Sequence, residues 1–95
     1  MKIVIHANYG EFSLIPKIET ALKNRGWTDD QISTVFDPSS PLRTDEALVS
    51  VVEYFKEQGK PTGDLKVLTI PDDTVWRIID KDGWEAVVDR RYFWY

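Results

Sequence analysis

The last third of the chain, residues 65–95, places the strongest constraint on the fold. LKVLTI is followed by a Pro-Asp-Asp turn, TVWRIID leads into Lys81-Asp82-Gly83-Trp84, and WEAVVDRRYFWY ends the sequence. β-Branched and aromatic residues dominate these runs. Asp-Gly is a strong signal for a type I′ hairpin, because both central residues of that turn need positive φ. The pattern predicts a three-stranded antiparallel meander that ends in a basic aromatic tail.

The first part of the chain predicts a strand and then a helix. Residues 2–6 alternate within a β-branched run and predict a strand, which the chain leaves through the loop Asn8-Tyr9-Gly10. Ser13 is the expected N-cap of a helix that ends at Gly26, and Pro16 fits its first turn because no N–H partner is lost there.

The middle of the chain predicts a short helical turn, a loop and a second main helix. Thr28 and Gln31 have capping-box spacing, so we expect a helical turn over residues 29–33. Residues 36–42 contain two prolines and two serines and predict a loop, which is long enough to be a candidate binding loop. A helix is expected to open at Arg43 or Thr44 and to end before Gly59. Its apolar residues repeat at helical spacing, at Leu48, Val51, Val52 and Phe55.

These elements predict one α+β domain over residues 1–95. The order β-α-α-β-β-β predicts a four-stranded mixed sheet with a right-handed crossover and two main helices on one face. The other face is expected to be open, with Trp76, Ile78, Trp84 or Trp94 on it. An open apolar face marks an interface with a partner or with a second copy of the chain.

Composition excludes several kinds of chemistry. The chain has no cysteine and one histidine, so it offers no disulfide, no thiolate metal site and no nucleophile–base pair. We expect a protein that is not an enzyme and needs no cofactor. The net charge of −4 argues against sequence-independent binding to nucleic acid, which depends on cations. The apolar run in MKIVIHANYG is too short for a signal peptide or a membrane span, so a cytoplasmic protein is expected.

Motifs over most of the chain resemble a family of small proteins encoded by tailed bacteriophages. They read R-x-D-x-x-L-x-x-V-V-E from Arg43, then L-K-V-x-x-I-P-D-D-x-x-W-x-I, D-G-x-E-x-V and a terminal aromatic-basic tail, with NYGEFSL near the start. The chain departs from the pattern at Glu11, where a second glycine is expected. It also departs in the tail, which has Arg90-Arg91-Tyr92-Phe93-Trp94 where a His-Arg pair is expected. The resemblance implies a phage origin and an accessory role in the host cell cytosol, without assigned chemistry.

The loop after the first strand is one candidate ligand site. Asn8, Tyr9, Gly10 and Ser13 lie between a strand and a helix start, where backbone N–H groups can hold a phosphate or a carboxylate. In the alternative interpretation, Gly10 only forms a turn and Ser13 only caps a helix.

Arg43 is a candidate partner for the same anion. It follows the proline-containing loop and precedes a helix, so it could reach a ligand held near the first helix. In the alternative interpretation it forms a local salt bridge or capping contact with Asp45.

The tail is a candidate partner-binding segment. Arg90, Arg91, Tyr92 and Trp94 combine cations with aromatic rings, a mixture suited to anchoring a protein or to stacking on bases. Alternation along a terminal strand explains the same residues as interface packing.

Three functions remain open at this point. The first is a non-catalytic phage protein that binds and inhibits a host defence or regulatory protein. The second is a binder that sequesters a nucleotide-type signal. The third, a small enzyme, lacks an acid–base set. His6 is expected to be structural, and an oligomer is compatible with each of the three.

Overall fold

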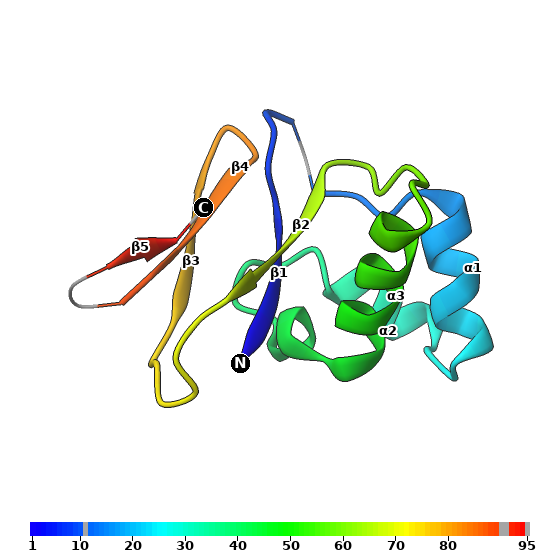
Figure 1. Ribbon diagram of the computed structural model, residues 1–95, viewed down its shortest axis with the longest axis horizontal. Coiled ribbons are helices and arrows are strands. Elements are labelled where there is room, and N and C mark those ends of the chain that lie inside the picture. Colours follow the sequence, from blue (N-terminus) through cyan, green and yellow to red (C-terminus); the bar gives the residue numbers. More distant parts are fainter. Residues whose placement is uncertain (11, 90–91, 95) are drawn as a thin grey trace.

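The computed structural model describes residues 1–10, 12–89 and 92–94 (Figure 1). Over these residues the chain has the order β1 (Lys2–His6), α1 (Pro16–Asn24), α2 (Asp29–Thr34), the 3-10 helix η1 (Pro41–Thr44), α3 (Glu46–Glu57), β2 (Leu65–Thr69), β3 (Arg77–Lys81), β4 (Trp84–Val88) and β5 (Phe93–Trp94). The predicted α+β class is confirmed. None of the helices described here is long and apolar enough to cross a membrane.

Within the described residues, the strands form two separate sheets instead of the predicted four-stranded mixed sheet. The inner sheet has the order β1-β2 and the outer sheet the order β3-β4-β5, and all pairings are antiparallel. The predicted parallel crossover is wrong because β2 begins beside the end of β1, with Leu65 opposite His6. Gly63 and Asp64, both at positive φ, turn the chain into this position, and the Asp64 carbonyl accepts a hydrogen bond from Ala7 N–H at 2.9 Å.

The predicted meander is shifted by one strand. β2 belongs to the inner sheet, and residues 70–76 carry the chain across to the outer sheet, where β3, β4 and β5 form the actual meander. The predicted Asp-Gly hairpin is confirmed, since Asp82 and Gly83 have φ of 54° and 94° and join Lys81 to its partner Trp84.

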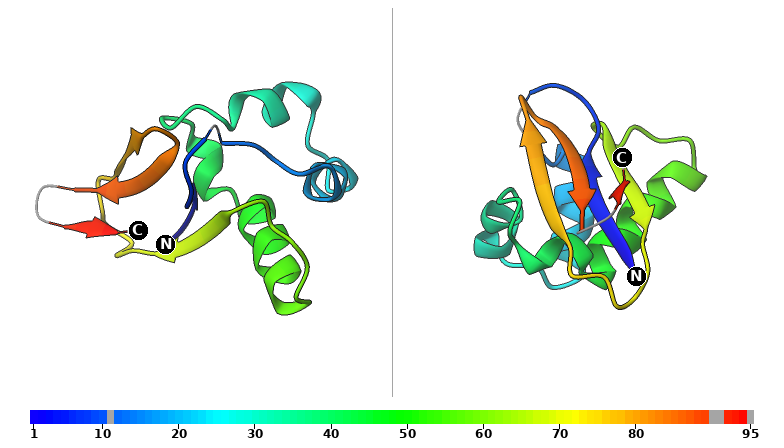
Figure 2. Two further views of the ribbon diagram at one scale, coloured as in Figure 1. Left: turned by 90° about the horizontal axis from the view of Figure 1, so that it is seen from above. Right: turned by 90° about the vertical axis from the view of Figure 1, so that its left-hand side faces the viewer.

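The inner sheet is the middle of three layers (Figures 1 and 2). Side chains alternate across a strand, so Val4 packs in the core under α1 and α3, whereas Ile3 and Ile5 pack against the outer sheet with Ile78 and Val87. Both faces of the inner sheet are therefore covered within one chain. The prediction placed an open face on the sheet that the helices cover. In the structure the open face is that of the outer sheet, on the side directed away from the inner sheet.

Local signals explain how the helices begin. The predicted capping box at Thr28 is confirmed, with Gln31 N–H donating to the Thr28 hydroxyl at 3.2 Å. Asp45, not Arg43 or Thr44, caps α3 by accepting a bond from Ala47 N–H at 2.8 Å. The prediction that Ser13 caps the first helix is wrong, because α1 begins at Pro16 after an N-cap residue whose side chain makes no capping bond.

Gly83 supports a prediction about this packing. A Cβ added to Gly83 would overlap the backbone of Gly10, whereas at Gly26, which has a similar positive φ, it would meet nothing within 4 Å. Alanine at either position strains the backbone by about 1–2 kcal/mol. We expect Gly83→Ala to lower the free energy of unfolding by about 1–3 kcal/mol more than Gly26→Ala, because of the added overlap. Urea denaturation of both variants measures the difference, and equal losses would contradict the close contact.

Candidate functional site

A buried ion pair joins η1 to the outer sheet. The Arg43 side chain is 0% exposed, and its Nη1 and Nη2 donate to Glu85 Oε1 and Oε2 at 2.7 and 3.0 Å. Its Nε, Nη2 and Nη1 also donate to the carbonyls of Val35, Phe36 and Val4 at 2.6, 3.0 and 3.3 Å. A guanidinium has five N–H groups, so each donor of Arg43 is used inside the protein.

The same ion pair satisfies the edge of β1 that faces away from β2. The Val4 carbonyl accepts from Arg43, and His6 N–H donates to Glu85 Oε1 at 2.7 Å. The carbonyl of one residue and the N–H two residues later point to the same edge of a strand. Arg43 and Glu85 thus take the place that a further strand would take. This explains why β4 lies beside β1 without joining the two sheets.

The structure therefore gives Arg43 a role that neither sequence interpretation included. Its guanidinium carbon lies 3.9 Å from the centre of the Phe12 ring, so an aromatic face covers the buried cation. Asp45, the predicted local partner, is occupied as the cap of α3. Because Arg43 has no exposed surface and all its donors are used within the protein, it is not placed to bind an added ligand.

Removing one partner of this ion pair should be costly. A buried charge left without its partner destabilises a protein by about 3–5 kcal/mol. We expect Glu85→Ala to lower the free energy of unfolding by that amount, and Arg43→Met/Glu85→Leu to lose less than the sum of the two single changes. The control is Glu53→Ala, which breaks the exposed Lys2–Glu53 pair and should cost under about 1 kcal/mol. Chemical denaturation tests this, and a Glu85→Ala loss as small as the control would contradict it.

The loop predicted to hold an anion is docked on the β3–β4 hairpin instead. Gly10 N–H donates to the Asp82 carbonyl at 2.8 Å, and Tyr9 N–H donates to Asn8 Oδ1 at 2.8 Å. Asn8 Nδ2 donates to Asp64 Oδ2 at 3.2 Å, and Ser13 is exposed and caps no helix. The N–H groups of Tyr9 and Gly10, two of those expected to hold a ligand, are thus occupied. Of the predicted ligand residues, Tyr9 alone lines one of the hollows described below.

His6 connects β1 to the same hairpin. Its side chain is buried, and Nδ1 lies 2.9 Å from the Gly83 carbonyl oxygen. A carbonyl can only accept, so Nδ1 carries the proton of this hydrogen bond. His6 therefore holds the hairpin turn against the end of β1, a structural role. Among the residues that the structure describes, no group of three or more histidines, cysteines or carboxylates is placed to hold a metal ion.

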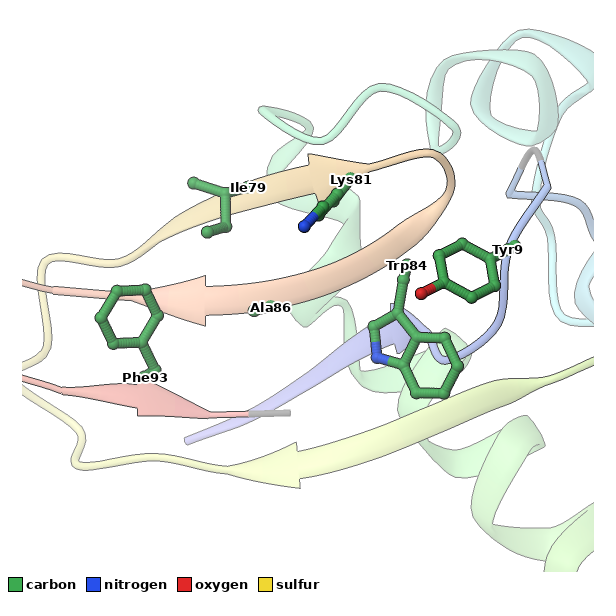
Figure 3. A pocket seen from close by; sticks show the side chains of 6 residues that line it. All are labelled: Tyr9, Ile79, Lys81, Trp84, Ala86 and Phe93. Carbon is green, nitrogen blue, oxygen red and sulfur yellow. The ribbon is translucent and has the colours of Figure 1, made fainter.

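The outer face of the outer sheet has an apolar hollow of about 310 Å³ (Figure 3). The small side chain of Ala86 forms its floor, Phe93 stands at one end, and Trp84 at the other with Tyr9 beside it. The Tyr9 and Trp84 ring centres are 5.5 Å apart. Tyr9, Trp84 and Phe93 are 66%, 40% and 60% exposed. Large aromatic surfaces at this level of exposure are typical of binding sites rather than of protein interiors.

The charges on this face differ from those of the whole chain. Residues that are paired across neighbouring strands share a face, so the described outward-facing side chains follow from the register: Arg77, Ile79, Lys81, Trp84, Ala86, Val88 and Phe93. They include two cations and no carboxylate, whereas the chain has a net charge of −4. The Lys81 ammonium reaches over the sheet into the hollow (Figure 3). An aromatic hollow with cations beside it favours apolar groups that are flanked by negative charge.

The predicted partner-binding tail is placed only in part. Arg90 and Arg91 lie outside the described residues. Tyr92 is exposed, but Trp94 is half-buried and packs against the core between the sheets, because it pairs with inward-facing Val87. The alternation expected for the tail is therefore seen at Phe93 and Trp94, with Phe93 on the exposed side.

Sequence reasoning missed part of this site, although the signal was present. Trp84 was among the four residues expected on an open face, but Trp76, Ile78 and Trp94 pack around the core between the sheets. A two-residue turn at Asp82-Gly83 fixes which residues pair. Counting outward from that turn in steps of two gives Lys81, Ile79, Trp84 and Ala86 on one face.

The loop at 37–41 is fixed by its own hydrogen bonds. Asp37 Oδ1 accepts from Ser39 N–H and from the Ser39 hydroxyl, each at 2.8 Å. These two bonds hold the pKa of the Asp37 carboxyl below its usual range, and the bond from the Ser39 backbone N–H makes the larger contribution. A lowered pKa in the folded state stabilises the protein at pH values above the unfolded pKa, and this contribution is lost as the pH falls through the folded pKa.

NMR titration of the Asp37 carboxyl tests the loop. We expect its midpoint to lie below the ordinary aspartate value of about 3.9. Ser39→Ala should raise the midpoint partway, because the backbone bond remains. An ordinary midpoint in the wild type, or no change in the variant, would contradict the hydrogen bonds described.

No protein-family model, curated protein or solved structure was found to match the chain.

Proposed function

We propose that this chain is a non-catalytic binding protein that docks a partner protein on the outer face of the outer sheet. The single observation that carries the proposal is the hollow over Ala86, with exposed Trp84 and Phe93 at its two ends and Lys81 at its side. Binding energy at protein interfaces concentrates where aromatic residues and a pocket meet. The complementary partner presents one aromatic or branched apolar side chain that seats over Ala86, with carboxylates opposite Lys81 and Arg77.

The resemblance to small proteins of tailed bacteriophages extends this proposal. On that basis the partner is a host defence or regulatory protein in the host cell cytosol, and the chain inhibits it by covering its surface. Inhibition by occlusion needs no acid–base residues. Rigidity also supports it, because the hairpin that carries Lys81 and Trp84 is held from below by the bonds of His6 and Glu85, and a rigid surface loses little entropy on binding.

A nucleotide-type ligand is the second candidate for the same hollow. Its volume of about 310 Å³ lies at the lower end of small-molecule sites. A base could stack on Trp84 or Phe93 while a phosphate pairs with Lys81. A protein that sequesters such a signal should be stabilised against heat by it, because ligand binding to the native state raises stability. Thermal unfolding with adenine and guanine nucleotides separates the two candidates, since a protein-binding surface gives no shift.

Variants of the hollow test the docking proposal. We expect Trp84→Ala and Phe93→Ala to weaken binding of the host partner at least about tenfold, because each removes an aromatic anchor. Ala86→Leu should do the same by filling the hollow. Tyr54→Ala is the matched control, since Tyr54 is a half-exposed ring on α3, away from the outer sheet.

The measurement is capture from infected-host lysate, followed by affinity measurement with the purified partner. A photo-crosslinking residue in place of Phe93 should link to the partner, and one in place of Tyr54 should not. Thermal unfolding of each variant shows that it is folded. Equal binding by the three variants of the hollow and the control, or crosslinking only from position 54, would contradict the proposed surface.

A further inference from the structure

β3 lies at one end of the outer sheet. The strand order is β3-β4-β5, so within the described residues no strand pairs with β3 on its other side. Lys81 and Trp84 flank the two-residue turn and form a hydrogen-bonded pair, and such pairs recur at every second residue of an antiparallel ladder. Ile78 and Asp80 therefore direct their backbone N–H and C=O groups away from β4. An edge of this kind is a template for an added strand.

A groove lies along part of this edge. It has a volume of about 500 Å³ and is lined by Trp76, Arg77 and Ile78 on one side and by the loop at 37–41 on the other. The loop is braced by the Asp37–Ser39 hydrogen bonds and contains two prolines, Pro38 and Pro41. The groove therefore has a strand edge as one wall and a restrained loop as the other.

The charges of β3 discriminate between two occupants of the edge. Arg77 and Lys81 flank Ile79 on the outward face. In a second copy paired antiparallel about Ile79, Arg77 of each chain would lie directly opposite Lys81 of the other. Like charges in that position are destabilising, and edge cations are a known obstacle to self-pairing. A strand that carries carboxylates at these two positions would instead be stabilised by both pairs.

We propose that the β3 edge binds an extended acidic segment of a partner protein as an added antiparallel strand. The backbone of that segment pairs with Ile78 and Asp80. Its side chains alternate, with a carboxylate opposite Arg77, an apolar residue opposite Ile79 and a carboxylate opposite Lys81. The recognised pattern is acidic-x-apolar-x-acidic. This inference rests on the strand edge and its charges. It shares Arg77 and Lys81 with the partner proposed for the hollow over Ala86, whereas the backbone pairing with Ile78 and Asp80 belongs to it alone.

Synthetic peptides test the strand addition. The first probe is a blocked peptide, Thr-Glu-Thr-Val-Thr-Glu-Thr, and the second has lysine in place of both glutamates. We expect the acidic peptide to shift the amide NMR signals of Ile78 and Asp80, and the lysine peptide to bind at least about tenfold more weakly. Methylating the backbone nitrogens that face β3 should abolish binding, because it removes the inter-strand donors. Equal binding of the acidic and lysine peptides, or shifts confined to β2 or β5, would overturn the proposal.

A charge swap gives a test that does not depend on loss of binding. In the double variant Arg77→Glu/Lys81→Glu the preference should reverse, so that the lysine peptide binds more tightly than the acidic one. Both side chains are exposed, and the variant is expected to keep its fold. Tyr54→Ala, a change on α3, should leave peptide binding unchanged. The backbone-methylated peptide reports on strand pairing alone, so failure at the β3 edge is distinguishable from failure at the hollow. Retention of the acidic preference in the swapped variant would also overturn the proposal.

Discussion

The Arg43–Glu85 ion pair holds the layers of this protein together. Four parts of the chain meet at it: η1, which carries Arg43; β4, which carries Glu85; β1, through Val4 and His6; and the end of α2, through the carbonyls of Val35 and Phe36. A buried charge is tolerable only when it is paired and hydrogen-bonded. Every segment must therefore be in place before the site is stable, which couples the helical layer to the outer sheet.

The pair also determines the surface that is left for binding. Because its side chains complete the edge of β1, β4 need not pair with β1, and the outer sheet packs face to face on the inner sheet. β1 is thereby buried on both faces from Ile3 to His6. The aromatic residues of the outer sheet then divide by alternation, with Trp94 directed to the core and Phe93 to solvent. The exposed rings around the hollow over Ala86 are thus a consequence of the buried Arg43–Glu85 pair, which lies on the opposite face of the outer sheet.

Local sequence signals predicted the elements well and their assembly poorly. The strand at Lys2–His6, the Thr28 capping box and the Asp82-Gly83 turn each depend on neighbouring residues, and each is seen in the structure. The partner of β2 depends on a contact between residues far apart, and a β-α-β pattern does not fix it. Arg43 and Glu85 are 42 positions apart, so no local spacing pairs them. The residues that line the hollow over Ala86 could have been predicted from the sequence, because the hairpin turn sets the register of the strands that carry them.

The contact between Gly10 and Gly83 has a consequence for how this chain can change in length. The loop that leaves β1 lies directly on the β3–β4 turn, with Gly10 N–H bonded to the Asp82 carbonyl and no space for a side chain at Gly83. An insertion or deletion between His6 and Gly10, or within the turn, would separate the two segments. The lengths of these two segments are therefore constrained together.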